Sequence, residues 1–93
     1  MSSSIVSKQT LKSNLITIYN SNGSYDLITL YRKLRIYNDK IRLYTRDDIY
    51  QNYISELYNI LDEHMYGEND IDFINDAKNN CLISLRKVIK YLK

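Results

Sequence analysis

The chain contains no proline and only two glycines, Gly23 and Gly67, among its 93 residues. Because these two residue types most often interrupt helices, their near absence predicts long helices. A chain of this length forms one domain and buries only roughly 60 to 65 per cent of its unfolded surface, so its core is thin. The sequence therefore predicts an all-α protein whose stability without a partner is marginal.

Charged residues make up 26% of the chain and apolar residues 44%, which is typical of a globular domain. No apolar run approaches the roughly 20 residues that a transmembrane helix needs. The single cysteine, Cys81, excludes an internal disulfide and fits a reducing compartment. It lies on an apolar stripe, which favours an inert buried thiol over a reactive one. His64 is the only histidine, so no metal site is expected.

The first core helix is expected from residue 25 or 26 to residue 41, with Ser24 or Asp26 as its cap. Its apolar residues follow spacings of three and four, which place them on one face of the helix. These residues are Leu27, Leu30, Leu34, Tyr37 and Ile41.

A different, polar face of the same helix carries Arg32, Arg35, Asp39 and Arg42. Tyr31 falls at the border of the two faces, and Ile28 falls among the arginines. An apolar side chain within a cationic stripe is typical of a docking surface, although single exposed apolar residues are also common.

A second helix is expected to begin at Thr45, whose hydroxyl can cap it while Asp48 complements the helix dipole, and to end before Gly67. A third helix is expected from residue 69 or 70 to Leu92. Both show apolar residues at helical spacing. They are Tyr50, Tyr53, Ile54, Leu57, Ile60 and Leu61, then Ile71, Ile74, Ala77, Cys81, Leu85, Val88 and Leu92. Three such helices predict an up-down-up bundle over residues 25–93.

Residues 1–24 are rich in serine, contain Lys8 and Lys12, and lack acidic residues. Leu11, Leu15 and Ile18 make the segment weakly amphipathic. This combination is similar to a mitochondrial import presequence. A flexible amino-terminal arm is the alternative interpretation.

Charges are segregated along the chain. Residues 26–46 carry six basic and two acidic groups, whereas residues 47–76 carry nine acidic groups and neither Lys nor Arg. Such blocks are most often solvated faces that attract one another across a bundle. Alternatively, the basic block is a landing site for an acidic partner.

The segment Leu27-Ile28-Thr29-Leu30-Tyr31-Arg32 places two apolar residues and a small hydroxyl before a Leu-Tyr-Arg triplet. With Ile41, Tyr44 and Tyr58 at the corresponding later positions, and Ala77-Lys78 with Leu82 or Leu85 on the third helix, residues 27–85 resemble the LYR-motif family. This family comprises small mitochondrial accessory and assembly factors. The small accessory subunit of cysteine desulfurase is the subgroup that the chain resembles most.

The resemblance implies a non-enzymatic, chaperone-like adaptor of the mitochondrial matrix that binds an acylated acyl carrier protein and stabilises cysteine desulfurase for iron-sulfur cluster assembly. It implies no cofactor of its own, because the carrier supplies the acyl-phosphopantetheine. The residues implied to contact the carrier are Ile28, Leu30, Tyr31, Arg32, Lys33 and Arg35. Those implied to contact the acyl-pantetheine group are Leu34, Tyr44, Leu57 and Tyr58.

Other functions stay open as alternatives. An assembly factor of a respiratory-chain complex shares the same motif. A nucleic-acid-binding helix could use Arg32, Arg35, Arg42 and Arg46, but the acidic middle of the chain argues against a nucleic-acid partner. An enzyme is not expected, because the acid pairs Asp47-Asp48 and Asp62-Glu63 point in different directions and no nucleophile completes a catalytic set.

Overall fold

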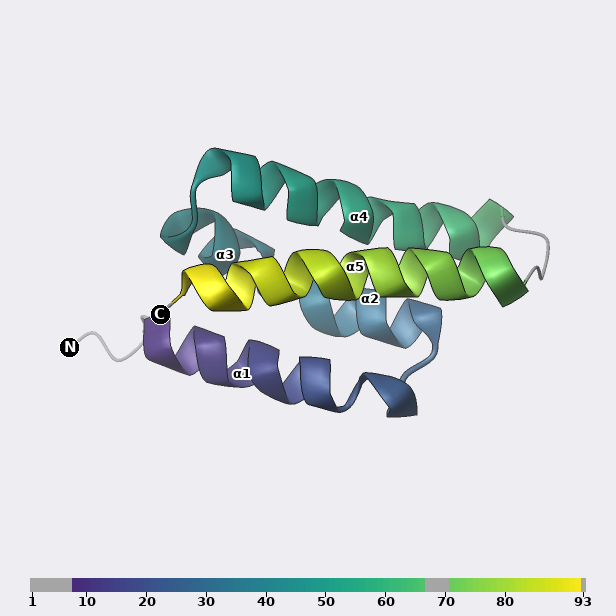
Figure 1. The fold of residues 1–93 in the computed structure, drawn as a ribbon, viewed down its shortest axis with the longest axis horizontal. Coiled ribbons are helices and arrows are strands. Elements are labelled where there is room, and N and C mark those ends of the chain that lie inside the picture. The colour runs from purple at the N-terminus through teal and green to yellow at the C-terminus, as the bar shows by residue number, and fades with distance from the viewer. Residues whose placement is uncertain (1–7, 67–70, 93) are drawn as a thin grey trace.

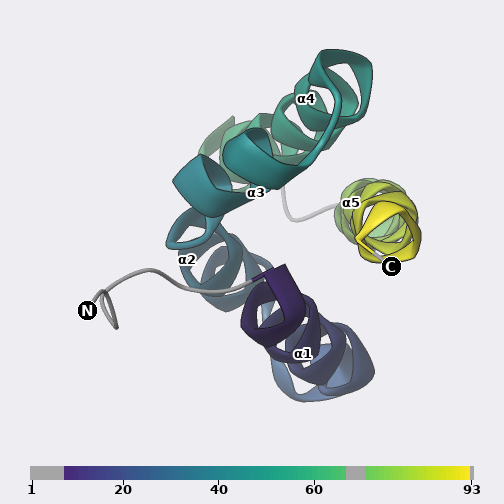
Figure 2. The ribbon, with the colours of Figure 1, turned by 90° about the vertical axis from the view of Figure 1, so that its left-hand side faces the viewer.

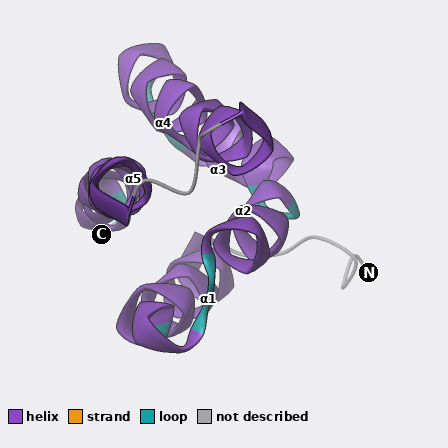
Figure 3. Cartoon of the chain, turned by 90° about the vertical axis from the view of Figure 1, so that its right-hand side faces the viewer, coloured by secondary structure: helices purple, strands orange, loops and turns teal. Residues whose placement is uncertain are grey.

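A computed structural model of the protein describes residues 8–66 and 71–92, and all of its regular structure in these residues is helical (Figure 1). Short loops join the α-helices from α1 to α4 (Figure 3), and a 3₁₀ turn lies between α1 and α2. In chain order the elements are α1 (Lys8–Asn20), η1 (Asn22–Ser24), α2 (Leu27–Arg35), α3 (Asn38–Tyr44), α4 (Asp47–Tyr66) and α5 (Ile71–Tyr91).

Helices α4 and α5 lie side by side and form the most extensive helix contact, while α2 packs on α4 and α1 packs on both α5 and α2. Seen end on, α4, α2 with α3, and α1 follow an arc, and α5 closes its open side (Figure 2). The predicted all-α class is confirmed. The predicted three-helix up-down-up bundle is wrong in detail, because the described residues form five α-helices.

One difference is a break in the predicted first helix. Tyr37 adopts φ −96° and ψ 1°, so α2 ends at Arg35 and α3 starts at Asn38. The Leu34 carbonyl accepts the Tyr37 N–H at 3.0 Å and the Tyr53 hydroxyl at 3.3 Å. A continuous helix would instead give this carbonyl to the N–H of residue 38. The tertiary bond from α4 thus occupies an acceptor that the uninterrupted helix would need.

The predicted helix caps have different outcomes. Asp26 caps α2 as predicted, since its side chain accepts the Thr29 N–H at 2.9 Å. Thr45 does not cap the next helix: its hydroxyl donates to the Ile41 carbonyl at 2.6 Å at the end of α3, and α4 begins at Asp47. The predicted stop at Gly67 and the predicted helix start at residue 69 or 70 lie outside the described residues.

The apolar periodicity places most of the core correctly. Seven predicted positions on α4 and α5 are buried: Tyr53, Leu57, Ile60, Ala77, Cys81, Leu85 and Val88. Leu92, directly after α5, is buried as well. The buried Ser84 is the polar exception, and its hydroxyl oxygen accepts a hydrogen bond from the Asn52 amide at 3.1 Å.

The amino-terminal segment contributes to this same core. Leu11 and Leu15 of α1 are 0% exposed and Ile18 is 7% exposed, and all three belong to the buried cluster formed with α2, α4 and α5. The folded unit therefore begins within the segment that was predicted as an arm, and not at residue 25. The weak amphipathicity of this segment did not predict that α1 packs on the core. Three buried side chains suffice for a helix that packs on one edge. Import targeting stays a prediction.

The connection from α1 to α2 is fixed by α5. The Lys78 ammonium group donates to the Asn22 carbonyl at 2.8 Å and to the Tyr25 carbonyl at 3.0 Å. An ammonium group has three donors, so it can bond to two carbonyls of the same connection at once. Lys78 thus ties the α1–α2 connection to the neighbouring helix.

We predict that Leu15→Ala lowers the free energy of unfolding by about 2–5 kcal/mol, the usual range for deleting a buried leucine. Leu43→Ala is the matched control, because Leu43 is 69% exposed, and its effect should stay within about 0.5 kcal/mol. Urea denaturation followed by circular dichroism measures both. Equal, small effects of the two substitutions would show that α1 does not belong to the cooperative core.

Candidate functional site

The Leu-Tyr-Arg segment lies in the middle of α2 and faces two environments. Arg32 and Arg35 are exposed, and Ile28 and Tyr31 are partly buried beside them. Leu30 is completely buried. Leu30 therefore cannot contact a protein partner from the surface, and its assignment as a carrier-contacting residue is corrected. Its side chain instead anchors the helix that presents the two arginines.

Tyr31 connects this surface to α4. Its ring lies 6.4 Å from that of Tyr58, measured between centroids, with the ring planes tilted by 54°. Tilted aromatic pairs at this distance attract each other beyond the burial of their area. Tyr58 is 49% exposed, so the pair forms an aromatic rim between α2 and α4. The structure thus brings together two residues that the sequence places 27 positions apart.

Lys33 lies apart from the two arginines. An α-helix turns by about 100° per residue, so residues 32 and 35 share a side that residue 33 does not. The Lys33 ammonium group lies over the Tyr25 ring, 5.0 Å from its centroid, in a cation–π contact. We therefore define the cationic face as Arg32 and Arg35 only, and remove Lys33 from it.

The remaining predicted contact residues lie deeper in the fold. Leu34 and Leu57 are completely buried, and Tyr44, at the end of α3, is partly buried against the core. Leu34 and Leu57 would meet an acyl chain only if that chain entered the core itself. Tyr58, in contrast, is available at the surface.

The other arginines of the predicted stripe have local partners. The Arg46 guanidinium forms a bidentate pair with Asp48, Nε to Oδ1 at 3.0 Å and a terminal nitrogen to Oδ2 at 2.9 Å. The hydrogen bond and charge of Asp48 raise the pKa of Arg46, and the bond to Arg46 lowers the pKa of Asp48. Arg42 lies over the Tyr50 ring, 5.9 Å from its centroid. A continuous stripe of four cations is therefore not formed.

Cys81 is a buried free cysteine, as predicted. Burial, with a smaller contribution from the charge of Glu56, raises the pKa of its thiol to about 12. The Tyr53 hydroxyl is also buried, and burial raises its pKa well above the ordinary value. Both groups stay protonated at neutral pH. Neither supplies a nucleophile or a base, because thiolate and phenolate are the reactive forms.

Among the side chains that the structure describes, within residues 8–63 and 72–92, no three His, Cys, Asp or Glu residues come together to hold a metal ion. No described helix is long and apolar enough to cross a membrane. Comparison with protein-family models, with curated proteins and with solved structures finds no match to the chain.

Sequence reasoning missed the surface between α1 and α2. Its side chains come from α1, Tyr25, α2 and the α2–α3 junction, and they meet because α1 packs on α2. The helical spacing of Leu11, Leu15 and Ile18 is the sequence pattern that indicates this packing.

We predict that the Cys81 thiol of the native protein does not react with a disulfide reagent at about pH 8, because the reactive thiolate is scarcely populated there. The same thiol should react in urea. Because the pKa of the thiol is higher in the folded than in the unfolded protein, the folded state binds the proton more tightly. The protein therefore loses stability as the pH rises from 9.0 toward about 12, where the unfolded thiol ionises first. Native labelling as fast as labelling in urea would contradict the assigned burial.

Proposed function

We propose that the protein is a non-enzymatic adaptor of the LYR type that binds an acylated acyl carrier protein in the mitochondrial matrix. Its client in this proposal is cysteine desulfurase, which it stabilises for iron-sulfur cluster biogenesis. The observation that carries the proposal is the surface of α2, where exposed Arg32 and Arg35 adjoin the aromatic rim of Tyr31 and Tyr58.

The composition of this surface fits an acidic, tethered partner. Two arginines that project from a rigid helix can form bidentate hydrogen bonds with carboxylates of an acidic helix. The aromatic rim offers apolar area with a phenolic hydroxyl beside it, which suits an amphipathic arm such as pantetheine. Electrostatic attraction would accelerate association and set the orientation of the carrier.

The acidic part of α4 restricts where such a carrier can lie. Asp62 is exposed one turn beyond Tyr58, and Glu63 follows it. Like charges repel, so an acidic carrier would sit over α2 and the aromatic rim, away from residues 62 and 63. The location of the cationic face on α2 supports the same placement.

In this proposal the acyl chain competes with α1. The side chains of Leu11, Leu15 and Ile18 complete the core beside α2 and α5. Burying three such side chains contributes about 5–9 kcal/mol, and burying a chain of about ten methylenes contributes about 8 kcal/mol. The two contributions are of similar size, so an acyl chain of that length could replace α1 in the core without a large loss of stability.

We predict that affinity purification of the protein, followed by intact mass spectrometry, recovers a small acidic protein that carries acyl-phosphopantetheine. Arg32→Glu should reduce the recovered carrier at least tenfold, because it sets a negative charge against an acidic surface. Arg42→Glu is the matched control, since Arg42 belongs to α3, lies over the Tyr50 ring of α4 and is outside the cationic face. Its effect should be less than threefold.

The same experiment distinguishes the alternatives. Recovery of cysteine desulfurase with the carrier supports the proposed client, whereas recovery of a respiratory-chain intermediate without desulfurase supports an assembly factor. Binding to DNA that weakens steeply with salt, with no carrier recovered, would replace the proposal by nucleic-acid binding. Equal losses of recovered carrier for Arg32→Glu and Arg42→Glu would show that the cationic face does not bind the carrier.

A further inference from the structure

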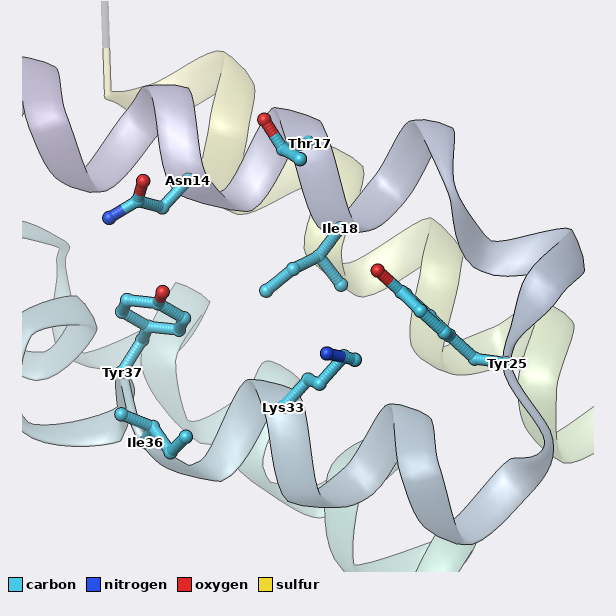
Figure 4. Close-up of a pocket in the computed structure, with 7 residues that line it drawn as sticks. All are labelled: Asn14, Thr17, Ile18, Tyr25, Lys33, Ile36 and Tyr37. Atoms are coloured by element: carbon cyan, nitrogen blue, oxygen red, sulfur yellow. The ribbon is translucent and has the colours of Figure 1, made fainter.

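A cavity of about 260 Å³ opens between α1 and the α2–α3 junction (Figure 4). Ile18 points from α1 toward α2, and Lys33 and Tyr37 project from the opposite side toward α1. Tyr25 borders it from the connection that precedes α2, and Asn14 and Ile36 lie at its other end. The cavity is thus built by three segments that are separate in the sequence.

The electrostatics of this cavity favour an anion. Its described lining contains one cation, Lys33, and no carboxylate. One wall comes from α1 and Tyr25, and residues 8–25 of the sequence contain no acidic residue. Among the described residues the Lys33 ammonium group is paired with the Tyr25 ring and with no carboxylate. Its charge is therefore available to a ligand, and the lining supplies further donors from the Asn14 amide and the hydroxyls of Tyr25 and Tyr37.

The remaining lining consists of Thr17, whose hydroxyl donates to the Ser13 carbonyl at 3.0 Å, and two isoleucines. Ile18, 7% exposed, reaches the cavity from the core, and Ile36, 73% exposed, borders it from the α2–α3 junction. An apolar group held between them would cover the large exposed side chain of Ile36. The cavity volume lies below the range of about 300–1,000 Å³ typical of sites for drug-sized molecules. The ligand is therefore small.

We infer that this cavity binds a small organic anion, a carboxylate or a phosphate joined to a compact apolar group. The anionic group meets Lys33 and the neighbouring hydroxyls, and the apolar group lies between Ile18 and Ile36. This site lies on a different side of α2 from Arg32 and Arg35. It goes beyond the proposed function and does not depend on it.

The test is isothermal titration calorimetry of the full chain with hexanoate and with hexyl phosphate. Hexanol, which lacks the charge, and inorganic phosphate, which lacks the apolar group, are the control ligands. At least one hexyl anion should bind with one-to-one stoichiometry, and both controls should bind at least tenfold more weakly. Tighter binding of hexanoate would identify a carboxylate ligand, and tighter binding of hexyl phosphate a phosphate ligand.

Two variants test the location. Lys33→Gln should weaken binding of the preferred anion about tenfold, the effect of losing one charge-assisted hydrogen bond. Arg35→Gln, an exposed cation on the same helix away from the cavity, is the matched control and should change the affinity less than twofold. Ile36→Ser should remove the advantage of the hexyl group without unfolding the protein, because the Ile36 side chain is exposed.

Three outcomes would overturn the inference: hexanol binding as tightly as the anions, equal losses for Lys33→Gln and Arg35→Gln, or no saturable binding of either hexyl anion. Circular dichroism of each variant confirms that it is folded. Because no carrier protein is present, failure of this test leaves the carrier proposal intact, and failure of carrier capture leaves this site intact.

Discussion

The structure depends on a core that no single pair of its helices completes. Helix α5 contacts α4 on one side and α1 on the other, and the buried side chains of α2 fill the space between them. In a domain this small, a few apolar side chains decide whether the native state is stable. The three buried residues of α1 therefore add to the stripes of α4 and α5, and Lys78 holds the turn that brings them into place.

This arrangement gives α2 its functional interest. The buried side chains of Leu30 and Leu34 anchor the helix in the core. The Tyr53 hydroxyl further restrains the helix, because it donates a hydrogen bond to the Leu34 carbonyl near the end of α2. Arg32 and Arg35 are consequently presented from a fixed support, which reduces the entropy lost when a partner binds. On its other side, α2 borders the cavity of Lys33 and Tyr25. One short helix thus carries two chemically different surfaces.

Helical periodicity predicted the core of α4 and α5 because both helices bury one continuous stripe, as Leu57, Cys81 and Leu85 illustrate. It also placed Leu27, Leu30 and Leu34 correctly. It could not predict the break at Tyr37, because the bond from Tyr53 to the Leu34 carbonyl joins distant parts of the chain. Likewise, the composition of residues 1–24 indicated an arm. The burial of Leu11 and Leu15 could not be predicted, because it depends on their packing against α2 and α5. Of the site, the exposure of Arg32 followed from the sequence, whereas the contact of Lys33 with the Tyr25 ring depends on how the chain enters α2 and could not be predicted.

The central proposal is that α1 occupies the part of the core that an acyl chain would take if a carrier bound α2. Hydrogen exchange of the backbone amides tests it most directly, with acyl carrier protein added in its decanoyl and its unacylated forms. We predict that the decanoyl form protects α2 and accelerates exchange in residues 11–18, while the unacylated form leaves residues 11–18 unchanged. Binding of the decanoyl carrier with full protection retained in α1 would contradict it.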